Sequence, residues 1–274
     1  MAPSVTSILF AIGARRDVVG VSKWCKDVAP TGRLPQVGDC WELDVADVMK
    51  LRPTLLVGSV PFSAEAVAKL IEQPVAFLAL NPRSLADIEA NVRTLGRLTG
   101  RVSAAEKLIR QMQDAFDAAA KRVALLGRTA SKPSVLWRGH PARGSFGLAR
   151  RSPLNASDTH RPRVYCEAWP NPRISSPPWV AELVSIAGGE FVTTPGSRVS
   201  DEDVARANPD LIVLAWTATG DRADSGRALR NPAWQATAAV RNGRVVVIRD
   251  ELLNTPGPPL MQGARALLRA IHAR

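Results

Sequence analysis

Cysteine, histidine and tyrosine are scarce in this chain of 274 residues. It holds three cysteines, three histidines and one tyrosine. The cysteines and histidines form no CxxC pair, no HExxH motif and no mixed metal-binding spacing, which argues against a zinc site and against histidine-dependent catalysis. A disulfide between Cys25 and Cys40 stays open, but three thiols do not make a disulfide framework.

The sequence also lacks long apolar runs and phosphate-binding motifs. No run approaches the roughly 18 apolar residues that a membrane-spanning helix needs. Neither a P-loop nor a GxGxxG turn between a strand and a helix is present. Glu167 and Asp250 lie at predicted strand ends, but no base or nucleophile accompanies either acid. We therefore expect a protein that is not an enzyme and that holds no metal or cofactor of its own.

Acidic residues are too few to balance the basic ones. The chain has 36 Lys and Arg against 25 Asp and Glu, a net charge of +11. Residues 128–163 carry seven arginines, one lysine and one aspartate, so this segment supplies most of the excess. A net positive charge of this size is compatible with three kinds of partner: nucleic acid, an anionic membrane surface or an anionic ligand. Because the basic residues are not interleaved with aromatic ones as in nucleic-acid-binding modules, no nucleic-acid partner is expected.

Short apolar runs alternate with segments of helical spacing along most of the chain. Helices are predicted at Val5–Ala14, Val45–Leu51, Ala64–Ile71, Trp179–Ala187, Glu202–Ala207 and Ala264–His272. Strands are predicted at Asp17–Ser22, Pro53–Val57, Val75–Leu80, Arg163–Ala168, Leu211–Trp216 and Arg244–Arg249. The alternation is typical of parallel sheets covered by helices on both faces, so the predicted fold class is α/β. Pro133–Trp137 competes with Arg163–Ala168 as the first strand of the second half.

Two helices in the middle of the chain have explicit start signals. Ser84 precedes Asp87 by three residues, and Ser103 precedes Glu106 by three, the spacing of a capping box. The second helix, predicted over 104–126, is about 34 Å long at 1.5 Å per residue, which favours a connection between two lobes. The predicted division is an N-terminal α/β lobe at 1–102, a connecting helix at 103–127, a basic irregular insertion at 128–163 and a C-terminal α/β lobe at 164–274.

Seven tryptophans stand against the single tyrosine. Trp24, Trp169 and Trp216 lie at or just after predicted strand ends, while Trp41 and Trp179 lie in segments flanked by proline or glycine. The carboxyl ends of parallel strands form the ligand crevice of α/β proteins. Indole rings there suit a large, partly polar ligand such as a macrocycle. The alternative is that each indole fills the core of a lobe.

Ser4 begins the first predicted helix. Its hydroxyl and the free N–H groups of the helix start can bind an anionic ligand group, or the residue can simply cap the helix. The residues alone leave both roles open.

Several short motifs, taken in order, resemble one protein family. Ala2–Thr6, Ile8–Ala14 and Val18–Ser22 resemble the opening of the helical-backbone substrate-binding proteins, the ABC-importer receptors for cobalamin, iron–siderophore and haem. The resemblance to the family continues in Leu34–Gly38, Leu51–Val57 and Ala207–Val213. Three further segments resemble the cobalamin-binding subgroup of the family: Glu167–Pro172, Trp179–Glu190 and Asn254–Pro258. The likeness spans nearly the whole chain. It is specific for the family and much less so for the ligand.

The resemblance implies two Rossmann-like lobes with parallel sheets, joined by a single long helix, with a ligand in the cleft between them. It implies capture of a corrinoid such as cobalamin (vitamin B12), or of a related metal chelate, and its delivery to an ABC permease dimer. We expect the receptor to be a monomer. The residues expected to contact the ligand are Ser4, Trp24, Trp41, Glu167, Trp169, Trp216 and Asn254.

Receptors of this family dock on the permease through one acidic residue on each lobe. Glu202 matches the second-lobe position, and Ala46 occupies the first-lobe position with Asp47 beside it. The resemblance therefore implies that Asp47 and Glu202 face the permease. The preference of helix starts for acidic residues accounts for Glu202 equally well.

The chain departs from the family in several places. Ser7 stands where the family usually has Glu, the strand that normally precedes Ala2 is not in the sequence, and 128–163 replaces a short connection. The residues before Val5 lack the basic start of a signal peptide, and Ile8–Gly13 is too short for its apolar region. A true start upstream predicts a periplasmic or other extracytoplasmic protein. A genuine start at Met1 predicts a cytoplasmic one, and favours the alternative of a chelatase-like or corrinoid-handling protein on the same fold.

Overall fold

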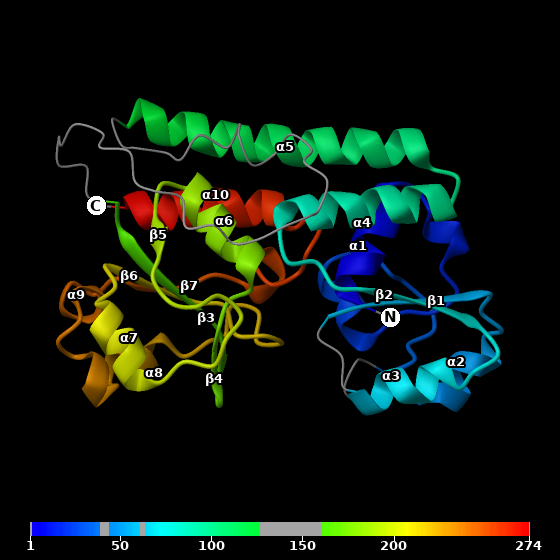
Figure 1. Cartoon of the computed structure of the whole chain (residues 1–274), viewed down its shortest axis with the longest axis horizontal. Coiled ribbons are helices and arrows are strands. Elements are labelled where there is room, and N and C mark those ends of the chain that lie inside the picture. Colours follow the sequence, from blue (N-terminus) through cyan, green and yellow to red (C-terminus); the bar gives the residue numbers. More distant parts are fainter. Residues whose placement is uncertain (1, 39–43, 61–63, 127–160, 274) are drawn as a thin grey trace, which may run out of the picture.

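The computed structural model describes residues 2–38, 44–60, 64–126 and 161–273. Two α/β lobes lie side by side, and α5 (Val102–Leu125) runs along both of them (Figure 1). The predicted α/β class with two lobes and one long connecting helix is confirmed. Trp41, Cys40, the candidate strand Pro133–Trp137 and nearly all of the basic segment lie outside the described residues.

The N-terminal lobe contains a short parallel sheet. Its elements are α1 (Pro3–Ala11), α2 (Val45–Lys50), β1 (Leu55–Ser59), α3 (Ala64–Ile71), β2 (Ala76–Leu80) and α4 (Leu85–Leu98). β1 and β2 pair in parallel, with Leu55 opposite Ala76. Four of these six elements fall within two residues of a predicted helix or strand at both ends. The short α/β alternation of the sequence is therefore reproduced in this lobe.

The strand predicted at Asp17–Ser22 is wrong. Arg15–Asp17 forms a 3-10 turn, and the chain beyond it makes a single parallel bridge between Val21 and Gln36. The Val21 N–H donates to the Pro35 carbonyl at 2.9 Å, and the Val37 N–H donates to the Val21 carbonyl at 3.0 Å. Proline has no N–H to continue the ladder, so a β-branched run that looks like a strand pairs at one point only.

The C-terminal lobe is built around β3 (Arg163–Pro170). β6 (Leu211–Leu214) and β5 (Glu190–Phe191) pair with β3 in parallel, β7 (Val245–Val247) pairs with β6 in parallel, and β4 (Arg173–Ser175) is antiparallel to β3. The helices are α6 (Pro178–Ile186), α7 (Asp201–Ala207), α8 (Ser225–Leu229), α9 (Ala238–Arg241) and α10 (Leu260–His272). All four residues of β6 are buried, as expected for a central parallel strand.

The two predicted helix caps have different outcomes. Ser84 caps α4, because its hydroxyl accepts the Asp87 N–H at 3.0 Å. Ser103 does not cap α5, which begins two residues earlier than predicted, with Arg101 as its N-cap and no side-chain cap. Glu106, the expected capping partner, accepts a hydrogen bond from Arg93 Nε at 2.9 Å instead. A tertiary ion pair to α4 therefore replaces the local capping box.

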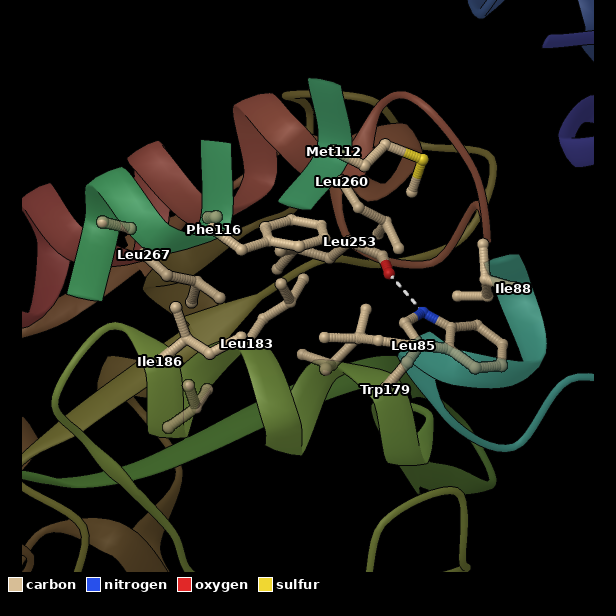
Figure 2. Packing of buried hydrophobic residues seen from close by; sticks show 14 of the residues in the cluster. Leu85, Ile88, Met112, Phe116, Trp179, Leu183, Ile186, Leu253, Leu260 and Leu267 are labelled. Atoms are coloured by element: carbon tan, nitrogen blue, oxygen red, sulfur yellow. Dashed lines mark hydrogen bonds between the residues drawn. The ribbon is translucent and has the colours of Figure 1, made fainter. Parts of the chain in front are cut away.

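A continuous apolar core joins the lobes beneath α5 (Figure 2). Met112 and Phe116 of α5 pack with residues of both lobes, among them Ile8, Leu85, Leu183, Leu253 and Leu260. Trp179 is part of this core at 3% exposure, and its indole N–H donates to the Leu253 carbonyl at 2.9 Å. Of the two roles that the sequence left open for this indole, the structure supports the core role, because α6 buries the ring and its one polar atom has a partner.

Candidate functional site

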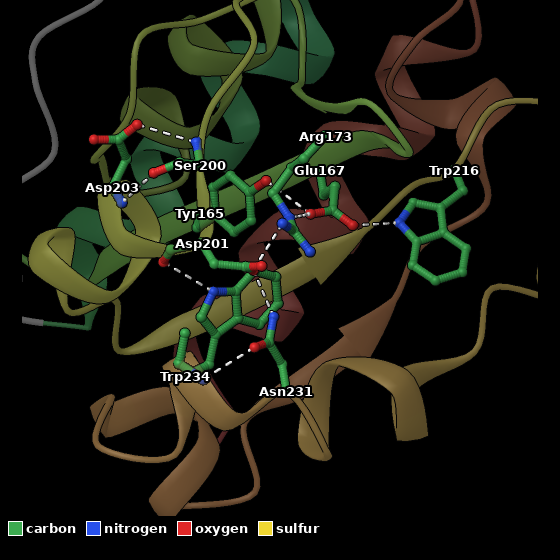
Figure 3. Close-up of polar contacts among 10 residues, drawn as sticks. Tyr165, Glu167, Arg173, Ser200, Asp201, Asp203, Trp216, Asn231 and Trp234 are labelled. Carbon is green, nitrogen blue, oxygen red and sulfur yellow. Dashed lines mark hydrogen bonds and ion pairs between the residues drawn. The ribbon is translucent and has the colours of Figure 1, made fainter.

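A polar network surrounds Glu167 near the carboxyl ends of β3 and β6 (Figure 3). Glu167 is only 1% exposed. Its Oε1 accepts the Trp216 indole N–H at 2.8 Å, and its Oε2 accepts the Tyr165 hydroxyl at 2.8 Å and Arg173 Nε at 2.7 Å. Every carboxylate oxygen therefore has a donor, as a buried charge requires.

Local β-structure explains how these side chains meet. Tyr165 and Glu167 are two residues apart on β3, so they lie on the same face of the sheet. The pairing of β3 with β4 shifts register between Glu167 and Trp169, and such an irregularity redirects the following side chains. Arg173 on β4 returns antiparallel to β3 and reaches Glu167 across the hairpin.

Arg173 extends the network to α7 and beyond. Its Nη1 lies 2.7 Å from Asp201 Oδ1, which also accepts from Asn231 Nδ2 at 2.6 Å. The guanidinium carbon is 4.6 Å from the centroid of the Trp234 ring, within cation–π range. Arg173 thus connects two carboxylates and an indole, which fixes its orientation.

Burial keeps the Tyr165 hydroxyl protonated. The ring is fully buried and makes an edge-to-face contact with Trp234 at 5.9 Å. Burial, followed by the nearby Glu167 carboxylate, raises the pKa of Tyr165 far above its ordinary value of 10.0. Tyr165 is therefore a permanent hydrogen-bond donor to Glu167.

A cavity of about 210 Å³ lies against this network. Its lining residues are Glu167, Arg173, Asp201, Trp216, Arg227, Ala228, Asn231 and Trp234. Glu167 and Trp216 were expected at a ligand site from the sequence, and the structure brings both to this cavity. The other six were not singled out. They come from β4, α7, α8 and the turn after it, so only the folded chain places them together.

The loop after β6 is held by two residues near the end of the chain. The Asp250 carboxylate accepts the N–H groups of Ala218 at 3.2 Å and Gly220 at 3.1 Å. Burial, followed by the neighbouring Glu251, raises the pKa of Asp250 to about 6. Asn254 Nδ2 donates to the Ala215 carbonyl at 2.6 Å, while its buried Oδ1 accepts from no described residue. Asn254 and Asp250 therefore fix the backbone on either side of Trp216.

The remaining predicted tryptophans lie apart from the cavity lining. Trp169 is 40% exposed, and its indole N–H donates to the Asn171 carbonyl at 2.8 Å. Trp24 is half-buried in a 3-10 turn, Lys23–Asp27, with Lys23 Nζ 5.3 Å from its ring centroid. Trp169 offers an open ring face, whereas the Trp24 ring already has a cation against it.

Ser4 does not cap α1. The N-cap is Ala2, which has no side-chain cap, and Ser4 is the second, buried residue of the helix. Pro3 occupies the first position, where its missing N–H costs nothing, so the helix begins two residues earlier than a cap at Ser4 would allow. The Ser4 carbonyl accepts the Ser7 hydroxyl at 2.7 Å. The capping role is wrong, and ligand contact stays a prediction.

The two candidate docking acids are on different lobes. Asp47 on α2 is exposed and lies 2.7 Å from Lys50 Nζ. Glu202 is exposed in the first turn of α7, and hydrogen bonds from its own backbone N–H and from the Ser200 hydroxyl lower its pKa. Both helices lie on the side of the molecule away from α5 (Figure 1). The two acids therefore lie on the same side of the molecule, where one partner surface can reach both. Their docking role stays a prediction.

The described residues contain neither a metal-binding cluster nor a membrane-spanning helix. Over these residues no group of three or more His, Cys, Asp or Glu side chains is placed to hold a metal ion. None of the described helices has the length and apolar character needed to cross a membrane. Cys25 is a free, buried thiol that accepts the Thr6 hydroxyl at 3.1 Å.

Comparison with known proteins assigns the family. The model of the family described as "Periplasmic binding protein" matches residues 1–152 and 148–252. The chain belongs to this family. It is accordingly a substrate-binding protein of the kind that serves ABC importers, as the sequence motifs predicted.

Two relatives and one solved structure illustrate the likeness. An uncharacterized ABC transporter substrate-binding lipoprotein of Bacillus subtilis is 23% identical, covering 98% of this chain and 78% of the relative. A cobalamin-binding protein of Halobacterium salinarum is also 23% identical, and the alignment covers 98% of this chain and 68% of the relative. A periplasmic heme-binding protein from Pseudomonas aeruginosa superimposes with a TM-score of 0.75 at 23% identity, covering 98% of this chain and 90% of that one. The structural likeness shows a shared fold.

Proposed function

We propose that this protein captures a corrinoid, or a related metal chelate, between its lobes and presents it to an ABC permease. The observation that carries the proposal is the family match over most of the chain, together with relatives named for cobalamin and for heme. Both ligands are large macrocyclic metal chelates, so the shared chemistry is a flat, partly polar ring system.

The tryptophans support a ligand of this kind. The exposed ring of Trp169 and the Trp216 ring lie near the carboxyl ends of β3 and β6, where α/β proteins bind their ligands. Aromatic faces gain from stacking on a macrocycle and cost little side-chain entropy. Ser4, Trp24, Trp41, Glu167 and Asn254 complete the proposed ligand-contact set.

The rigid connection between lobes fits a receptor that changes little on binding. α5 packs on both lobes, and the apolar core beneath it is continuous. One helix with such a core resists hinge motion more than several extended crossovers would. Asp47 and Glu202 would then meet the two subunits of a permease dimer with a fixed spacing. We place this receptor outside the cytoplasm, as expected for a protein that supplies an importer.

The test is direct binding of candidate chelates to the whole protein. Equilibrium dialysis against cyanocobalamin, haemin and a ferric siderophore, read by ligand absorbance, is expected to give micromolar or tighter binding of at least one. Trp169→Ala is expected to weaken that binding about tenfold, since stacking on a large ring contributes about 1 kcal/mol or more. Leu125→Ala, a change at an exposed apolar residue at the far end of α5, is the control. Failure of all three chelates to bind overturns the proposal.

A further inference from the structure

The cavity in the C-terminal lobe is lined by one arginine, Arg227, that no carboxylate of the described residues pairs with. Arg227 on α8 is exposed, and its guanidinium carbon lies 5.9 Å from the centroid of the Trp216 ring. Among the described residues no carboxylate pairs with it. Its neighbour Arg230, in contrast, pairs with Asp224 at 3.4 Å. Arg227 therefore lines the cavity with all its donors available.

Arg173 presents a second set of donors to the same cavity. Its Nε is taken by Glu167 and its Nη1 by Asp201. No described residue accepts a hydrogen bond from the remaining nitrogen, Nη2, and Figure 3 shows the guanidinium between Glu167 and Asp201 with Trp216 to one side. The Trp234 ring and the two carboxylates hold this guanidinium in place, so its free edge is preorganised.

The acceptors of the cavity wall are largely occupied. Glu167 accepts from Trp216, Tyr165 and Arg173, and Asp201 Oδ1 accepts from Arg173 and Asn231. The side-chain oxygen of Asn231 accepts the Ala233 N–H at 3.1 Å. What the wall still offers a ligand is the N–H donors of two arginines next to an indole ring, together with one acceptor, Asp201 Oδ2, which the Arg173 guanidinium at Oδ1 partly compensates.

We propose that this cavity binds an anionic oxygen group, a carboxylate or a phosphate, carried as a side arm by the chelate. Arginine recognises both groups through parallel N–H donors. The cavity volume of about 210 Å³ is many times the roughly 10–15 Å³ that holds one water, which leaves room for a phosphate or a short carboxylate arm. The inference rests on the proposed function and adds that the receptor selects chelates by a charged arm.

The test compares pairs of chelates that differ in the anionic arm alone. Cobinamide phosphate is paired with cobinamide, and haemin is paired with its dimethyl ester, which masks both carboxylates. Dissociation constants are measured by equilibrium dialysis on the whole protein. The native protein is expected to prefer the anionic member about tenfold, because hydrogen bonds to charged groups are roughly twice as strong as neutral ones.

The variant that decides the matter is Arg227→Gln. It removes one exposed charge and leaves no buried partner behind, so the fold is expected to be intact, which circular dichroism checks. The preference for the anionic member is expected to fall to about twofold or less, and Arg227→Lys is expected to keep part of it. Arg230→Gln, three residues along the same helix end, is the matched control and is expected to keep the full preference.

Each result has a separate meaning. Equal affinity for both members of a pair, or a preference that survives Arg227→Gln, overturns this inference and leaves the proposed function standing. Failure of all four chelates to bind overturns this inference, and failure of cyanocobalamin and the ferric siderophore as well overturns the proposed function with it. A preference that Arg227→Gln abolishes and Arg230→Gln retains supports both.

Discussion

Glu182 on α6 accepts a hydrogen bond from the backbone N–H of Leu85, the first residue of α4, at 3.2 Å. The carboxylate belongs to the C-terminal lobe and the amide to the N-terminal lobe. An acid at a helix N-terminus is favoured by the free N–H groups there. Burial nevertheless dominates, and it raises the pKa of Glu182 to about 7. This contact between lobes therefore titrates near neutral pH.

Glu182 is expected to make the protein less stable as pH rises toward neutrality. The pKa of Glu182 in the folded state lies above the ordinary value of 4.5. Between about pH 4.5 and pH 7 the folded chain therefore holds a proton at Glu182 that the unfolded chain has lost. The free energy of unfolding therefore contains a contribution that is present at low pH and lost as pH rises through 7. Glu182→Gln removes this titration and is expected to stabilise the protein at pH 8 by on the order of 1–2 kcal/mol, allowing for partial exposure.

Urea unfolding of the native protein and of Glu182→Gln at pH 5 and pH 8 measures the difference. Comparing the two proteins cancels other titrating groups, including Asp250, whose pKa is also raised. An identical dependence on pH in both proteins contradicts the assignment.

Breaking the ion pair between Arg173 and Glu167 is expected to destabilise the C-terminal lobe strongly. The two side chains are 14% and 1% exposed, and Arg173→Met leaves the Glu167 carboxylate buried without its cation. Loss of one partner of a buried pair costs about 3–5 kcal/mol. The double variant Glu167→Gln/Arg173→Met is expected to be more stable than Arg173→Met alone, since it removes the uncompensated charge. Chemical denaturation of the two single variants and the double variant gives the coupling energy, and simple additivity would argue against the pair.

Trp179→Phe is expected to weaken the core that joins the lobes. The change removes the indole N–H donor to Leu253 and leaves part of a fully packed volume empty. A lost hydrogen bond and a small cavity together cost about 2–4 kcal/mol. Thermal and urea unfolding measure the loss. Leu125→Ala at an exposed position is the control, and it is expected to change stability by no more than about 0.5 kcal/mol.

Asp250→Ala is expected to loosen the loop that follows Trp216. It leaves the Ala218 and Gly220 N–H groups without their acceptor. Amide hydrogen exchange at these two positions is expected to accelerate more than about tenfold, while the protected amides of β6 change far less. Glu251→Ala, at the adjacent position, is the matched control because its carboxylate pairs with Arg249 instead. Unchanged exchange at Ala218 and Gly220 would show that the loop is held by other contacts.

Local sequence patterns predicted the presence of helices and strands better than they predicted where each one ends or which strands pair. Ala64–Ile71 was predicted with the bounds that α3 has, because its apolar spacing and the adjacent turn residues depend on neighbours in sequence. Asp17–Ser22 failed because strand formation depends on a partner, and the partner offers Pro35 where a donor is needed. The capping box at Ser103 failed because Arg93, on another helix, takes Glu106.

The candidate site shows the same limit. Trp216 and Glu167, which line the cavity, were singled out from the sequence because strand ends in α/β proteins are where ligands bind, and their contact with a ligand stays a prediction. Arg173 follows Glu167 by six residues, a spacing that is compatible with a pair across a hairpin, but nothing local places Asp201, Asn231 or Trp234 beside them. Those contacts require β3, α7 and the turn after α8 to pack together.

The sequence by itself determined the α/β alternation, the long connecting helix, the family and the presence of indoles at strand ends. These depend on periodicity, helix-compatible spacing and ordered motifs, which are properties of neighbouring residues. Only the tertiary structure decided that Trp179 belongs to the core, that Ser4 is not a cap, and that Arg227 and Arg173 meet at one cavity. Each of these depends on which distant side chains exclude water or supply a hydrogen-bond partner, and that is settled when the lobes pack.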